Sequence, residues 1–122
     1  VALVHEMGYE NRVLYSSFNH RSVLKVREFD PDAKLAFLYS HQLSGVAGYA
    51  KMNGVSAVNP SVLCTHLEDE MHDCLKNNID IHVWTVNSED EMHRLCKMGV
   101  SAIITNYPDV AKSICEEEKS GV

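Results

Sequence analysis

The feature that most constrains this chain is an alternation of short apolar segments with amphipathic helical segments. Near the carboxyl end, residues 82–87 (HVWTVN) and 99–108 (GVSAIITNYP) each carry a short apolar run that ends in polar residues, and a helical pattern separates them. Strands that alternate with helices in this way indicate βα units and a parallel sheet. In such sheets ligands bind at the carboxyl ends of the strands.

The same alternation extends over the whole chain. Strands are predicted for residues 13–17, 34–39, 55–58, 81–86 and 102–105. Helices are predicted for residues 20–29 and 65–77, where apolar side chains recur at helical spacing, and for the segment that starts at Ser88. Ser88 and Glu91 form the pattern of a capping box, and Gly99 is placed to end that helix. The sequence therefore predicts an α/β fold built from parallel βα repeats.

Two architectures fit five parallel strands with short connections. One is an open, doubly wound sheet, and the other is an arc of a (βα)8 barrel. A full barrel needs about 250 residues, and this chain has 122. The residue pattern alone does not separate these two alternatives.

Composition excludes several classes of function. A formal net charge of −6 argues against a nucleic-acid or anionic-membrane surface, which needs clustered Lys and Arg. The apolar runs fall short of the roughly 20 residues that cross a bilayer. The four cysteines show no CxxC pairing and lie in apolar or helical segments, so we expect buried, reduced thiols rather than disulfides, and with them a cytoplasmic location.

Polar and aromatic residues gather where the predicted strands end. They include Ser17, Phe18, Asn59, Trp84 and Asn87. In either parallel architecture these ends share one rim, so residues far apart in sequence are expected to converge there. Turns and helix caps need the same Ser and Asn residues, and that alternative stays open for each of them. For the lone Trp84, a binding role and a core role have equal weight.

The rim lacks the usual signatures of catalysis. It has no paired carboxylates, no Glu-x-Asp or Asp-x-Asp metal motif, and no nucleotide-binding glycine loop. Four histidines, at positions 5, 66, 72 and 93, are expected to face solvent rather than bind zinc. His82 shares a strand face with Trp84, and His20-Arg21 and His41 are the best-placed cations for a phosphate. The visible residues suit binding better than catalysis.

Several segments resemble the glycerophosphodiester phosphodiesterases. The resemblance runs in order through Ser16-Ser17-Phe18, residues 57–60 (AVNP), residues 82–87 and residues 99–108. That family is a TIM barrel, and the five strands resemble its fourth to eighth. The resemblance implies that residues 1–122 are the C-terminal portion of such a domain, with about five of its eight βα units.

The resemblance also implies a division of labour within the domain. Trp84 and Phe18 are expected to form the apolar side of the substrate pocket, with Ser17, Asn59 and Asn87 as further substrate-binding candidates. The family's catalytic and metal-binding residues lie on its first three strands and have no counterpart here, so no catalytic or metal residue is assigned; His20-Arg21 follows a different strand from the family's His-Arg pair. The intact enzyme is expected to use a divalent cation, Mg or Ca, to hydrolyse glycerophosphodiesters to an alcohol and glycerol 3-phosphate.

Two further interpretations remain. In these, the chain is either a non-catalytic, truncated relative that acts as a binding or assembly module, or an unrelated open-sheet protein. If the chain is part of a barrel, the cut edges predict a partner, which is either the missing barrel portion or a second copy of the chain. Alone, the chain is expected to be inactive.

Overall fold

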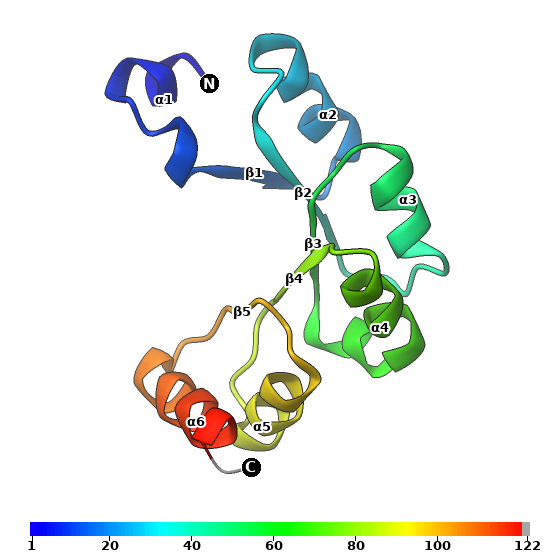
Figure 1. Cartoon of the computed structure of the whole chain (residues 1–122), viewed down its shortest axis with the longest axis vertical. Coiled ribbons are helices and arrows are strands. Elements are labelled where there is room, and N and C mark those ends of the chain that lie inside the picture. Colours follow the sequence, from blue (N-terminus) through cyan, green and yellow to red (C-terminus); the bar gives the residue numbers. More distant parts are fainter. Residues whose placement is uncertain (121–122) are drawn as a thin grey trace.

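The computed structural model describes residues 1–120 and shows one parallel sheet with helices along one side (Figure 1). The strands are β1 (Leu14–Ser17), β2 (Lys34–Tyr39), β3 (Ala57–Pro60), β4 (Asp80–Val83) and β5 (Ala102–Ile103). The helices are α1 (Ala2–Met7), α2 (His20–Phe29), α3 (Val46–Met52), α4 (Glu68–Lys76), α5 (Glu89–Met98) and α6 (Pro108–Ser120), with short 3-10 turns η1 (Glu10–Arg12) and η2 (Val62–His66).

The strand order decides between the two architectures. All strands of residues 1–120 are parallel and follow the order β1-β2-β3-β4-β5, so each strand lies beside the one that precedes it in sequence. A doubly wound sheet reverses its order and carries helices on both faces. Here helices α2 to α6 follow one another around a single side of the sheet (Figure 1). This is the topology of a barrel arc, and the predicted α/β class is confirmed.

The core lies between the sheet and the helices. Alternate strand residues point into it, among them Phe37 on β2, Val58 on β3 and Ile81 on β4, each with no exposed surface. Met71 of α4 and Leu95 of α5 close the layer from the helix side. Burying such side chains contributes roughly 1.5–3 kcal/mol each to stability. The two-residue period of the strands and the helical period of the helices both direct apolar side chains into this core.

Several predicted details differ from the structure. The fourth and fifth strands are shorter than predicted and end at Val83 and Ile103. The third strand lies two residues further along the chain than predicted, at Ala57–Pro60. Asn59 and Pro60 therefore belong to the strand rather than to the turn after it. The helix predicted for residues 65–77 begins at Glu68, after the separate turn η2. Ser88 does cap α5 by accepting from the Glu91 N–H at 3.5 Å, but the Glu91 carboxylate turns away to Arg94, so the reciprocal half of the capping box is absent.

The expectation of four reduced cysteines is wrong for one pair. Cys96 of α5 and Cys115 of α6 form a disulfide, whereas Cys64 and Cys74 are buried free thiols as predicted. The two bonded residues lie 19 positions apart on different helices, and only the packing of α5 against α6 brings their Cα atoms to 5.5 Å. Sequence spacing carries no sign of this pair, because the helices rather than a CxxC motif set the distance.

Candidate functional site at the carboxyl ends of the strands

The helix-free face of the sheet carries the candidate site. The pairing places Ala36 beside Ala57 and Leu38 beside Asn59, and the same register leads from Asn59 to His82 on β4. One step further toward the carboxyl ends, an isolated bridge joins Ser61 to Trp84. These side chains alternate with the buried core residues, so they face away from the helices.

Phe18 and Trp84 meet at the carboxyl end of this face. Their ring centroids are 5.7 Å apart and the rings stand at 85°, an edge-to-face arrangement. Phe18 is 58% exposed, although it packs on Trp84. Aromatic pairs of this geometry are worth about 0.5–1.5 kcal/mol beyond the area they bury. Residues from two strand ends that are 66 positions apart therefore form one apolar wall that is partly open to solvent.

Trp84 is held in place by the residues that end β3. Its indole Nε1 donates to the backbone carbonyl oxygen of Asn59 at 2.8 Å. Its backbone N–H donates to Pro60 at 3.1 Å, and its carbonyl oxygen accepts from Val62 at 2.7 Å. These three bonds fix both the backbone and the ring of Trp84.

Asn59 also fixes His82. Nδ1 of His82 lies 2.9 Å from Oδ1 of Asn59, and because an amide oxygen only accepts, Nδ1 carries the proton and donates. This tautomer leaves Nε2 as the acceptor nitrogen of the ring. His82 thus reaches the same face as Trp84, and Asn59 links the two through its side chain and its carbonyl group.

Two other predicted site residues, Ser17 and Asn87, make local hydrogen bonds. Ser17 pairs with Phe37 in the register and so belongs to the helix side; its Oγ accepts from the Asn19 N–H at 3.0 Å. Asn87 accepts from the Thr105 hydroxyl at 3.2 Å and from the Asn106 N–H at 3.0 Å, which ties the loops after β4 and β5 together. In this structure both residues serve loop geometry beside the wall.

The cationic candidates also have structural surroundings. His20 stacks on Phe37 with centroids 4.2 Å apart, and its Nε2 donates to the carbonyl oxygen of Leu38 at 3.0 Å. Its other nitrogen lies 2.9 Å from the Tyr49 hydroxyl. With both nitrogens engaged, His20 is a partly buried core residue rather than a free phosphate ligand, while His41 is exposed in the loop after β2.

One residue of the face was not predicted from the sequence. Ile104 follows β5, is 49% exposed, and lies on the same face as Trp84 by continuation of the pairing of His82 with Ala102. Its N–H donates to Val83 at 2.7 Å, which holds it beside β4. The two-residue alternation within residues 102–105 pointed to it, but an isolated isoleucine carries no chemical signal of a site.

Known proteins identify the chain's family. The model of the glycerophosphoryl diester phosphodiesterase family matches residues 1–110. The chain belongs to this family. A glycerophosphodiester phosphodiesterase of Caldanaerobacter subterraneus is 30% identical over 109 residues, which cover 89% of this chain and 44% of that protein. This chain therefore spans less than half the length of that relative.

Solved structures give the same fold. A glycerophosphodiester phosphodiesterase from Parabacteroides distasonis superimposes with a TM-score of 0.87 at 23% identity, covering 98% of this chain and 49% of that one. An Oleispira antarctica phosphodiesterase, solved with its product sn-glycerol-3-phosphate, gives a TM-score of 0.75 at 17% identity, covering 84% and 41%. At these identities the likeness shows the fold alone, which is about half of a TIM-barrel domain.

Proposed function

We propose that this chain forms one wall of the substrate pocket of a glycerophosphodiester phosphodiesterase that acts in glycerophospholipid metabolism. The observation that carries the proposal is the Phe18–Trp84 pair, which stands on the helix-free face at the carboxyl ends of the strands. In a TIM barrel the active site is built at that end from the loops after the strands. Membership of the family supplies the reaction class, hydrolysis of a phosphodiester to an alcohol and glycerol 3-phosphate.

The wall suits the carbon skeleton of a glycerol moiety. The rings of Phe18 and Trp84 offer apolar contact to C–H groups. The acceptor Nε2 of His82 lies on the same face, where a hydroxyl group of the substrate can donate to it. Asn59, which holds both Trp84 and His82, contributes to binding by fixing these two groups.

Catalysis and metal binding are assigned to residues outside this chain. Among residues 1–120 no group of three or more His, Cys, Asp or Glu side chains is arranged to hold a metal ion. The proposal therefore assigns the divalent cation, Mg or Ca, to the remaining units of the domain. Within the same residues no helix has the length and apolar composition that spanning a bilayer requires.

An open arc also requires a partner. The five strands leave two sheet edges, at β1 and at β5. A (βα)8 barrel needs about three further βα units to close. The proposal is therefore that the chain works with the remaining units of the domain, and that the isolated chain does not hydrolyse phosphodiesters.

The binding part of the proposal can be tested with intrinsic fluorescence. Trp84 is the only tryptophan of the chain, so its emission reports on the wall directly. Titration with glycerophosphocholine is expected to change the Trp84 emission in the unaltered protein and to lose this response in Phe18→Ala. Phe29→Ala is the matched control, because Phe29 is a similarly exposed phenylalanine at the end of α2, away from the wall. An unchanged response in Phe18→Ala contradicts the proposed wall.

The catalytic part has its own test. The pure chain is incubated with glycerophosphocholine and Mg²⁺ or Ca²⁺, and free choline is measured. No release above the uncatalysed rate is expected from the chain alone. Metal-dependent release by the chain alone overturns the assignment of catalysis to other residues, while leaving the family and the wall unaffected.

A further inference from the structure

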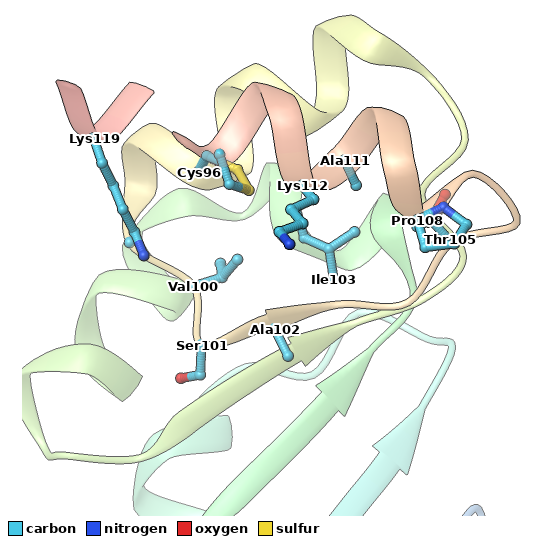
Figure 2. Close-up of a pocket in the computed structure, with 12 residues that line it drawn as sticks. Cys96, Val100, Ser101, Ala102, Ile103, Thr105, Pro108, Ala111, Lys112 and Lys119 are labelled. Atoms are coloured by element: carbon cyan, nitrogen blue, oxygen red, sulfur yellow. A yellow bond between two sulfur atoms is a disulfide. The ribbon is translucent and has the colours of Figure 1, made fainter. Parts of the chain in front are cut away.

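A cavity of about 500 Å³ between β5 and α6 belongs to the open end of the arc (Figure 2). It is lined mainly by apolar residues such as Val100, Ile103 and Ala111, and within residues 1–120 β5 pairs with β4 alone. The surroundings of His20 are different. The strands and helices that enclose its ring, β1, β2, α2 and α3, all lie within the chain.

The side chain of His20 joins three elements near the rim. It belongs to the first turn of α2, stacks on Phe37 of β2 with ring centroids 4.2 Å apart, and lies 2.9 Å from the hydroxyl of Tyr49 on α3. Its Nε2 reaches the backbone carbonyl oxygen of Leu38 at 3.0 Å. The ring is therefore held at one face and at both nitrogens, two residues after Phe18 of the candidate wall.

The Leu38 carbonyl group points to a place where β1 has already ended. The carbonyl of the next residue, Tyr39, faces β3, because it accepts from the Ser61 N–H at 3.0 Å. Carbonyl groups alternate in direction along a strand, so the Leu38 carbonyl faces β1. However, β1 ends at Ser17. Continuation of its register makes the Asn19 N–H the next donor, but that N–H donates to the Ser17 hydroxyl at 3.0 Å.

His20 supplies a donor at this position. A carbonyl oxygen only accepts, so Nε2 carries the proton, and in the neutral ring Nδ1 accepts from the Tyr49 hydroxyl. Backbone carbonyl groups that are removed from water need a hydrogen-bond partner. The imidazole provides one for Leu38 where the neighbouring strand has stopped. The chain can therefore leave the sheet directly after Ser17.

The position of Phe18 depends on how this turn is held. Its ring is 58% exposed and packs edge-to-face on Trp84, so it does little to fix its own backbone. Asn19 caps α2 by accepting from the Ser22 N–H at 3.1 Å. This cap sets where the helix begins, but it lies within the helix and does not tie the turn to the sheet. The side chain of His20 makes that tie.

We propose that His20 is a positioning residue of the substrate pocket. It holds the Leu38 carbonyl and the Tyr49 hydroxyl. In this way it fixes the turn that carries Phe18 and keeps that ring against Trp84. The inference rests on the proposed function for the role of the wall in binding, but the position of Phe18 can be measured without a substrate.

Arg27 makes a matched contact at the other end of α2. Its Nη2 donates to the carbonyl oxygen of Gly54 at 3.1 Å, so it too joins a side chain of this helix to a backbone carbonyl group. Arg27 lies in the last turn of α2, whereas Phe18 precedes the first turn. Loss of the Arg27 bond is therefore expected to lower stability without moving Phe18.

The test measures acrylamide quenching of fluorescence in the full 122-residue chain, in which Trp84 is the only tryptophan. Phe18 packs on the indole, so displacement of Phe18 is expected to raise the quenching constant. His20→Phe keeps an aromatic ring to stack on Phe37 but loses both hydrogen bonds. In this variant we expect at least half of the increase that Phe18→Ala produces. His20→Gln keeps an N–H donor and is expected to bring the constant back toward that of the unaltered protein.

A double-variant cycle shows whether His20 acts through Phe18. In the Phe18→Ala background, His20→Phe is expected to raise the quenching constant no further. An equal increase in both backgrounds overturns the inference, because His20 then affects Trp84 independently of Phe18. An unchanged constant in His20→Phe, a constant in His20→Gln as high as in His20→Phe, or the same increase in Arg27→Met also overturns it.

Urea unfolding gives the stability of each variant and separates loss of the fold from displacement of Phe18. If His20→Phe does not fold, Tyr49→Phe replaces it, since this variant removes only the hydroxyl that holds Nδ1. A smaller increase in quenching is expected there, and no increase overturns the inference.

Titration with glycerophosphocholine separates this inference from the proposed function. A weaker response of the Trp84 emission in His20→Phe, with a restored response in His20→Gln, supports both. If the unaltered protein gives no response but quenching changes as expected, the proposed function fails and the positioning role stands. Unchanged quenching and an unchanged response in His20→Phe overturn the positioning role and leave the proposed function intact.

Discussion

The indole nitrogen of Trp84 donates to the main-chain carbonyl oxygen of Asn59, and the Asn59 side chain accepts from His82, two residues before Trp84. One asparagine of β3 thus holds His82 of β4 through its amide and Trp84, just after β4, through its backbone. Any residue at position 59 keeps the backbone carbonyl group. A substitution there therefore removes the contact with His82 and keeps the contact with Trp84.

Asn59→Ala is therefore expected to release His82 while leaving Trp84 in place. The loss of one partly buried hydrogen bond costs about 1 kcal/mol of unfolding free energy, whereas the emission maximum of Trp84 stays near its original value. Urea unfolding followed by circular dichroism gives the first quantity and fluorescence the second. Asn106→Ala is the control, since the side chain of Asn106 is exposed. A shifted Trp84 emission in Asn59→Ala contradicts the view that the carbonyl alone holds the indole.

Arg94 joins α5 to the turn that follows β3. Its guanidinium donates to the Glu91 carboxylate at 2.6 Å and to the Thr65 hydroxyl at 2.6 Å. Thr65 has no exposed surface and itself donates to the carbonyl oxygen of Val62, whose N–H donates to Trp84. A single arginine thus supports the segment that holds the candidate wall.

Arg94→Met is expected to destabilise the fold by roughly 1–3 kcal/mol, because Glu91 and Thr65 lose a charged partner. Urea unfolding measures this change. Arg21→Met is the matched control, since Arg21 is exposed on α2 and away from η2. Equal stabilities of the two variants would show that the contacts of Arg94 contribute nothing beyond those of an ordinary surface arginine.

Some features of this fold could be predicted from the sequence, and others depend on contacts between distant residues. The helical spacing of apolar residues predicted α2 at its observed bounds, because this spacing follows directly from backbone geometry. The parallel βα pattern placed the strand ends, and with them Phe18 and Trp84, on one rim, where the two rings are in contact. Ser17 and Phe18 were both predicted for the substrate pocket, but the pairing of Ser17 with Phe37 places Ser17 on the helix side of the sheet, and this pairing is set by β2 rather than by the local sequence. The Cys96–Cys115 bond depends on the packing of two helices, which no local pattern encodes.

The burial and pairing of the four cysteines predict which thiols react with a labelling reagent. Burial raises the pKa of Cys74 to about 11, and Cys64 is 2% exposed, so neither is expected to react with iodoacetamide in the folded protein at pH 8. Mild reduction without unfolding is expected to add two labels, at Cys96 and Cys115, and unfolding under reducing conditions to give four. Mass spectrometry counts and locates them. Label on all four thiols of the unreduced, folded protein contradicts both the burial and the disulfide.

The expected cytoplasmic location rested on reduced thiols, and the Cys96–Cys115 bond removes half of that basis. In Cys96→Ser/Cys115→Ser, α6 keeps its packing against α5 and the contact between His93 and Glu118. The helix is therefore expected to remain folded but to exchange its amide hydrogens faster. Hydrogen exchange of α6 in this variant and in the unaltered protein therefore measures how far the bond restrains the helix.

A last prediction concerns the attachment of α1. The hydrogen bond from His5 to the Asp30 carboxylate, at 2.9 Å, ties α1 to the end of α2 and lowers the pKa of Asp30. A carboxyl group with a lowered pKa contributes stability above its unfolded value, and this contribution is lost as the pH falls through the lower folded value. Protection of the α1 amides is therefore expected to fall selectively below about pH 4.

Asp30→Asn is expected to lose this protection at neutral pH too. The control Asp32→Asn is expected to keep it, since only the Asp32 backbone contacts Asp30. Hydrogen exchange followed by NMR between about pH 3 and about pH 7 distinguishes the variants, and equal protection of α1 in all three proteins would exclude His5–Asp30 as the anchor.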